Sequence, residues 1–195
     1  MQQINDTVFG LKREHFIFHA AKDFLDRGVE RLKEVHVLDC SKFHSDDTWN
    51  LCFPLTNISS GLELAIKGFL PYSKKEYRYH RLFDLYKEID SNIQNEIENH
   101  FESCGAYNWN FSNLVFGKEG TSPDISSTRN KILDALKRCN KSFEQCRYLF
   151  EYTIDKGNYY FDCNTLIKLT HSCLAVQSEK LNIKPQPFHL ANSSD

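Results

Sequence analysis

The sequence predicts an all-α protein, a helical bundle of about five to seven helices. Apolar residues recur at helical spacing in several long segments, while almost no segment shows the alternation typical of a strand. With 195 residues, of which 41% are hydrophobic, the chain is long enough to bury one core. We therefore expect a single helical domain over residues 1–184 and a frayed C-terminal tail over residues 185–195.

The N-terminal part of the chain is predicted to be helical up to a polar break. An apolar stripe that includes Phe16, Ala20 and Phe24 predicts a helix over residues 16–25. Gly28 is expected to interrupt or end this helix, because glycine is a poor helix former. A further apolar segment follows, and a polar break over residues 39–50 ends the region.

A second, more apolar helix is predicted over residues 51–70. Pro54 is compatible with this helix only in its first turn, where a missing N–H costs little. Gly61 and Gly68 lower the helix propensity, but they would let a neighbouring helix come close.

The second half of the chain is predicted to hold three more helices, separated by loops and one long irregular stretch. Ser126 or Ser127 is suited to cap the second of these helices. Residues 104–124 have no helical or strand period and are expected to form an irregular surface excursion. The expected elements are a loop over residues 71–79 and helices over residues 80–101, from Ser126 or Ser127 to Phe150, and over residues 165–181.

Composition limits the classes of function that need to be considered. The net charge of -2 excludes a uniformly basic nucleic-acid binder but leaves room for a local basic patch. The N-terminus is polar, and no apolar run reaches the length of a membrane span. The seven cysteines include no CxxC pair, which is typical of reduced, buried thiols. We expect a cytoplasmic protein with no membrane partner, no metal site and no cofactor.

Glu63 and Lys67 are the first candidate site residues. They are four residues apart, so they share one helix face and can form an ion pair across a turn. A solvated surface pair is one interpretation. The other is functional, because the surrounding helix is apolar nearly all round and a carboxylate at the border of a core needs a partner.

The segment that follows this helix combines cations with aromatic rings. His80 stands at the start of the next predicted helix, directly after the segment. Cations can bind phosphates and tyrosines can stack on unpaired bases, so the pattern suits single-stranded nucleic acid. An exposed surface loop is the alternative interpretation. With Lys67, the candidate phosphate contacts are Lys74, Lys75, Arg78 and Arg81, and the candidate stacking residues are Tyr72, Tyr77 and Tyr79.

Arg147 is the third candidate. It lies four residues before Glu151, on the edge of an apolar helical segment. An arginine in this position could clamp a phosphate, bridge to a carboxylate such as Glu63, or form a structural pair with Glu151. Arg31 and His36 in the N-terminal region are a weaker arginine–histidine pair.

Residues 62–70, Leu-Glu-Leu-Ala-Ile-Lys-Gly-Phe-Leu, followed by His80-x-Leu-x-x-Leu85, resemble the helix–loop–helix of HEPN-type proteins. The resemblance is best over residues 50–90 and extends to Arg147-Tyr, which is similar to a pair late in some members. This family consists of prokaryotic all-helical domains from toxin–antitoxin, abortive-infection and other phage-defence systems. Many members are dimeric ribonucleases that need no metal, and others are non-catalytic partners of nucleotidyltransferases.

The resemblance implies a homodimer that is associated with RNA or with a partner protein, in phage defence or a toxin–antitoxin system. Catalytic members carry Arg-x4–6-His on a late helix, whereas here no histidine follows Arg129 or Arg147 at that distance. As an alternative to a binding module, the chain would be a metal-independent ribonuclease or a non-catalytic structural subunit. The catalytic candidates are then His80, Arg147 and Glu63, with His36 and Arg31 as a substitute pair.

Overall fold

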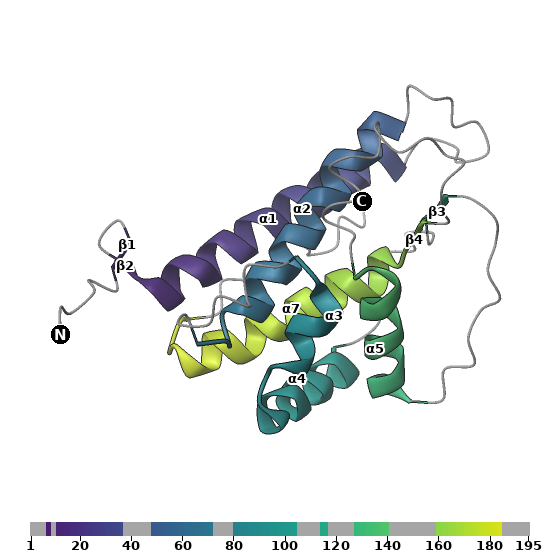
Figure 1. Ribbon diagram of the computed structural model, residues 1–195. Helices are drawn as coiled ribbons and strands as arrows, with labels where there is room; N and C mark the ends of the chain where they lie inside the picture. The colour runs from purple at the N-terminus through teal and green to yellow at the C-terminus, as the bar shows by residue number, and fades with distance from the viewer. Residues whose placement is uncertain are drawn as a thin grey trace.

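The chain folds as an all-α bundle in the computed structural model, which describes residues 7–8, 11–36, 48–71, 80–104, 114–116, 127–140 and 159–184. The predicted fold class is thereby confirmed, and two short strand pairs accompany the helices (Figure 1). The helices of the described residues are α1 (Arg13–His36), α2 (Thr48–Lys67), α3 (Leu82–Lys87), α4 (Ser91–Ser103), α5 (Thr128–Arg138) and α7 (Cys163–Lys180).

Both strand pairs are antiparallel and very short. β1 (Thr7–Val8) pairs with β2 (Leu11–Lys12) directly before α1. β3 (Leu114–Phe116) pairs with β4 (Tyr159–Phe161), which precedes α7. The prediction of an irregular stretch over residues 104–124 is therefore wrong for β3, whose partner strand lies far away in the sequence.

Helix α1 is not interrupted at Gly28, in contrast to the prediction. Val29 and Leu32 continue the buried stripe of the helix beyond it. Gly28 faces α2 so closely that a Cβ atom there would lie 3.0 Å from the carbonyl oxygen of Pro54 and 3.0 Å from the backbone nitrogen of Ile58. The packing of two helices thus outweighs the low helix propensity of glycine.

Helix α2 begins at Thr48, earlier than predicted, so that Pro54 lies inside the helix rather than in its first turn. The prediction that Gly61 lets a neighbouring helix come close is confirmed. A Cβ atom at Gly61 would lie 3.0 Å from the carbonyl oxygen of Ala21 and 3.1 Å from the backbone nitrogen of Leu25. Helices α1 and α2 accordingly run side by side in close contact (Figure 1).

The helix predicted over residues 80–101 is two helices, α3 and α4, with a break between them. Asp90 caps α4 by accepting a hydrogen bond from a backbone N–H two residues further on, at 2.9 Å. The buried Gln94 reaches back from α4, and its Nε2 donates to the carbonyl oxygens of Tyr86 and Ile89, both at 2.9 Å. These bonds satisfy the carbonyl groups at the end of α3.

Helix α5 begins at the predicted cap. The hydroxyl of Ser127 accepts a hydrogen bond from the backbone N–H of Asn130 at 3.2 Å, and the helix ends at Arg138. The rest of the helix predicted to reach Phe150 lies outside the described residues.

Helix α7 is the centre of the bundle and packs against α1, α2, α4 and α5 (Figure 1). It is buried nearly all round, although it contains several polar residues. The hydroxyls of Thr170, Ser172 and Ser178 donate to backbone carbonyls of the preceding turn, at 2.7, 2.9 and 2.7 Å. Because these three hydroxyls are satisfied within the helix, they can be buried without loss of hydrogen bonds.

Candidate functional site

Three of the predicted site residues, Glu63, Lys67 and His80, meet where α2 approaches the start of α3. Glu63 is only 6% exposed, and both of its carboxylate oxygens have partners. Oε1 accepts from Nζ of Lys67 at 2.6 Å, and Nδ1 of His80 lies 2.9 Å from Oε1 and 2.8 Å from Oε2. The acid at the border of the core thus has the partners that its burial requires.

A hydrogen bond from α7 holds the C-terminal end of α2 in place. The side chain of Gln177 on α7 donates from Nε2 to the carbonyl oxygen of Ala65 at 2.7 Å. Gly68 makes room for this amide, because a Cβ atom at that position would lie 1.9 Å from Nε2 of Gln177. The last turn of α2, which carries Glu63 and Lys67, is thereby fixed against the centre of the bundle.

The start of α3 is held by Asn140, which follows α5. The backbone N–H of Phe83 donates to Oδ1 of Asn140 at 2.8 Å, and the N–H of Leu82 donates to its carbonyl oxygen at 3.3 Å. Arg81, the residue at the N-cap position, makes no side-chain cap. Asn140 therefore fixes the first turn of α3, and with it the position of His80.

Sequence reasoning identified neither Asn140 nor Gln177. Both act through hydrogen bonds to backbone groups of elements that are distant in sequence, by 57 residues between Asn140 and Phe83 and by 112 between Gln177 and Ala65. No local pattern indicates such bonds. A weak signal existed only for Gln177, which directly follows the apolar run of residues 173–176.

The contact with Glu63 indicates which nitrogen of the His80 ring carries a proton. An ionised carboxylate only accepts hydrogen bonds, so Nδ1 of His80 is the nitrogen that carries the proton. In the neutral ring, Nε2 is then the basic nitrogen. The His80 side chain is 41% exposed, whereas those of Lys67 and Glu63 are 19% and 7% exposed. The arrangement is a carboxylate–histidine pair with an oriented ring at the protein surface.

The other predicted site residues are not part of this cluster as far as the structure describes them. Arg81 is exposed and lies 3.9 Å from Asp84, the distance of a weak surface pair. Arg31 forms an exposed ion pair with Glu34 on α1. The remaining candidates lie outside the described residues: Lys74, Lys75, Arg78, Arg147, the side chain of His36 and the three tyrosines of the predicted loop.

Comparison with known proteins found no matching family model, no matching curated protein and no matching solved structure. The resemblance to HEPN-type proteins therefore stays a prediction from the sequence. None of the helices within the described residues combines the length and apolar character needed to cross a membrane. The same residues contain no cluster of three or more histidine, cysteine or acidic side chains that could hold a metal ion.

Proposed function

We propose that this protein is a HEPN-like RNA-associated module that binds single-stranded RNA at the α2–α3 junction. The observation that carries the proposal is the contact of His80 with Glu63, which anchors one end of the basic and aromatic segment over residues 72–79 to α2. The resemblance of residues 50–90 to HEPN-type proteins supports it. We further propose, from the same resemblance, that the protein acts as a dimer in phage defence or a toxin–antitoxin system.

The local charge supports RNA as the ligand. Within ten residues, from Tyr72 to Arg81, the sequence contains four lysines and arginines and three tyrosines but only one acid. Lys67 is neutralised by Glu63, so phosphate binding depends mainly on the four cations of this segment. Cations of this kind supply affinity that depends on salt, and tyrosine rings supply stacking that does not depend on base sequence.

The RNA-binding proposal predicts a salt-sensitive loss of affinity on removal of the four cations. Replacing Lys74, Lys75, Arg78 and Arg81 together with alanine is expected to weaken binding of a labelled single-stranded RNA about tenfold or more at low salt. The slope of log K against log salt should fall by about 2 to 3, because each phosphate contact contributes about 0.7 on a single strand. Fluorescence anisotropy at several salt concentrations measures both quantities.

A variant with the same change in charge is the control for this experiment. Arg27 on α1, Lys131 and Lys137 on α5 and Lys180 on α7 are exposed and lie outside the proposed site. Their fourfold replacement with alanine should leave most of the affinity in place. Equal binding by the two fourfold variants would show that the α2–α3 junction is not the RNA site.

A metal-independent ribonuclease is the second candidate function, and the orientation of His80 by Glu63 specifically favours it. As a general base, Nε2 of His80 would take the proton of a ribose 2′-OH, whose oxygen attacks the adjacent phosphorus. The bond between phosphorus and the 5′ oxygen breaks, and this oxygen takes up a proton from water, so the products are a 2′,3′-cyclic phosphate and a 5′-OH. An arginine such as Arg147 would stabilise the charge that develops on the phosphoryl oxygens. In this scheme Glu63 acts as a positioning residue.

The ribonuclease hypothesis predicts RNA cleavage that persists in EDTA and is lost in the His80→Ala variant. Removal of a general base is expected to lower the rate about 100-fold or more. Glu63→Gln should leave a smaller defect, because the amide oxygen can still accept from Nδ1. Gel analysis of the cleaved ends would identify the cyclic phosphate. Purified protein that is inert on all RNAs tested, yet binds them, would leave RNA binding in place and reject cleavage.

A further inference from the structure

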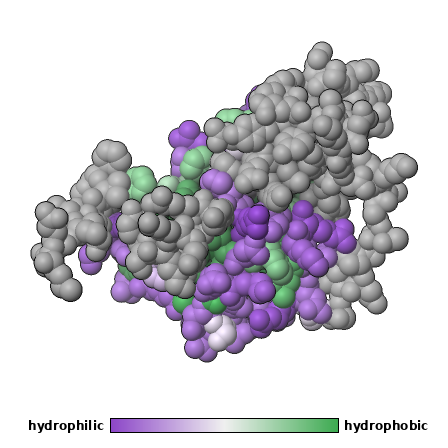
Figure 2. Space-filling view, viewed as in Figure 1, coloured by the Kyte–Doolittle hydropathy of each residue, from purple (hydrophilic) through white to green (hydrophobic). Residues whose placement is uncertain are grey.

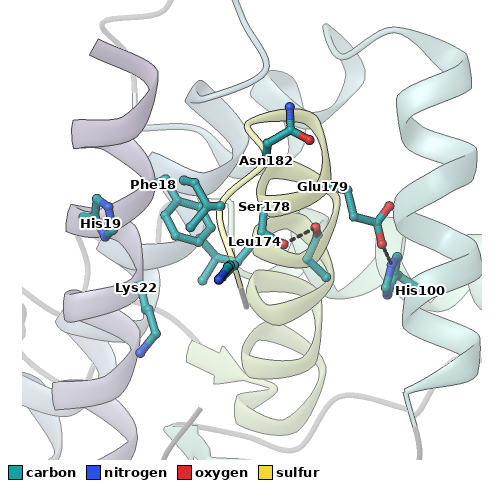
Figure 3. A pocket seen from close by; sticks show the side chains of 11 residues that line it. Phe18, His19, Lys22, His100, Leu174, Ser178, Glu179 and Asn182 are labelled. Carbon is teal, nitrogen blue, oxygen red and sulfur yellow. Dashed lines mark hydrogen bonds and ion pairs between the residues drawn. The ribbon is translucent and has the colours of Figure 1, made fainter. Parts of the chain in front are cut away.

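A cavity lies away from the Glu63 cluster, across the C-terminal half of α7. It has a volume of about 540 Å³ and is bounded by α1 on one side and α4 on the other (Figure 3). The volume is within the range of about 300–1,000 Å³ that is usual for small-molecule sites. It shares no lining residue with the cluster of Glu63, Lys67 and His80.

The floor of the cavity is apolar. The apolar lining residues are Leu174 and Ala175 on α7, Ile183 after the helix and Phe18 on α1. Phe18 reaches from α1 toward α7 (Figure 3). In the view of Figure 2 the described surface is mainly hydrophilic, with smaller hydrophobic areas between the polar side chains. The apolar lining favours a ligand with an apolar body, because burial of that body supplies the main part of the affinity.

The charged groups on the wall favour an anion. The lining contains two lysines, Lys22 and Lys184, and one acid, Glu179. That acid is already engaged, because His100 on α4 lies 3.2 Å from its Oε1 (Figure 3). Lys22 pairs with Asp26 at 2.5 Å, one turn further along α1 and outside the lining, so a ligand carboxylate could share this lysine.

The negative end of α7 is screened by its own cap. The backbone N–H groups of Asn182 and Ile183 donate to the carbonyl oxygens of Glu179 and Ser178, at 3.3 and 2.9 Å. Asn182 has a φ of 51°, the left-handed conformation that closes a helix in this way. The carbonyl groups nearest the cavity are thus occupied, which reduces their repulsion of an anion.

From the apolar lining, its two lysines against one acid and the capped helix end, we infer that this cavity binds an amphipathic monocarboxylate of the medium-chain fatty-acid class. The alkyl chain lies on Leu174, Ala175 and Phe18. The carboxylate lies toward Lys22 and Lys184.

Octanoate, used at concentrations at which it is monomeric, is the probe that tests the inference. Its dissociation constant is expected to be on the order of 1 mM. Its binding should shift the backbone NMR signals of residues 174–184. Acetate, which lacks the chain, and 1-octanol, which lacks the charge, should each bind about tenfold more weakly or worse. Octanol binding as tight as that of octanoate, or shifts confined to other elements, would overturn the assignment.

Variants with controls locate the site. Replacing Lys22 and Lys184 with alanine is expected to weaken octanoate binding about fivefold or more, whereas replacing the exposed Lys131 and Lys137 on α5 should leave it unchanged. Ala175→Phe, which fills the cavity, should abolish binding while the NMR spectrum remains that of a folded protein. If Ala175→Phe unfolds the chain, the lysine pairs decide the matter: equal affinity of both double variants would overturn the inference.

Discussion

Replacing Gly61 with valine is expected to lower the free energy of unfolding by about 3 kcal/mol. At Gly61 a Cβ atom alone would lie 3.0 Å from the carbonyl oxygen of Ala21 and 3.1 Å from the backbone nitrogen of Leu25. These are backbone atoms of α1, so no side chain can rotate away and the two helices must separate. Overpacking of this kind costs about 1–3 kcal/mol, and the extra methyl groups of valine place the cost at the upper end.

Urea unfolding monitored by circular dichroism measures this effect, with two variants as references. Gly61→Ala should lose less stability than valine does, because the gain of about 1 kcal/mol in helix propensity offsets part of the strain. Asn95→Val on the exposed face of α4 introduces the same side chain without a packing partner and should change stability by about 0.5 kcal/mol or less. A Gly61→Val variant no less stable than Asn95→Val would contradict the close packing of α1 on α2.

The helices of this bundle were predictable from the sequence wherever one continuous apolar stripe corresponds to one helix. The stripes of α1, α2 and α7 and the Ser127 cap of α5 are local features, so they could be read without the fold. The break between α3 and α4 was missed because the apolar period runs on through it. Asp90 followed by Ser91 was the available signal for a cap, and only the folded chain shows that Gln94 closes the break.

The wrong predictions of a helix break at Gly28 and of an irregular stretch at β3 have the same physical origin. Both features of the structure depend on contacts between segments that are far apart in the sequence. Glycine at position 28 lowers the local helix propensity of α1, and the close packing of α2 against this position offsets that cost. Leu114–Phe116 has no strand pattern of its own and becomes a strand through pairing with Tyr159–Phe161. A local pattern reports propensity, which such tertiary contacts override.

The candidate site was partly predictable for an electrostatic reason. A carboxylate on an apolar helix requires a partner, and this argument pointed to Lys67 and to Arg147. His80 was predicted as a residue of the same site, and the structure shows that it is the second partner of Glu63. Asn140 and Gln177 hold the start of α3 and the end of α2 in place through hydrogen bonds to backbone groups. These groups belong to elements that are distant in the sequence, so no local pattern indicates the bonds.

The contact between Glu63 and His80 is expected to contribute measurably to stability, and a double-mutant cycle isolates its contribution. Glu63→Ala should lower the free energy of unfolding by about 2–3 kcal/mol, because it leaves the partly buried Lys67 and His80 without their acid. The value lies below that of a fully buried pair, since the His80 side chain is 41% exposed. Combining Glu63→Ala with His80→Ala should give a coupling energy of about 1 kcal/mol.

The exposed pair of Arg81 and Asp84 on the neighbouring turn is the matched control for this cycle. Their side chains are 55% and 54% exposed and lie 3.9 Å apart, so their coupling energy should be about 0.5 kcal/mol or less. A Glu63–His80 coupling no larger than that of this surface pair would show that Glu63 does not hold the ring. It would also remove the structural support for His80 as an oriented base. A coupling near 1 kcal/mol, by contrast, would show that the ring is oriented in the absence of any ligand, as pre-organised catalysis requires.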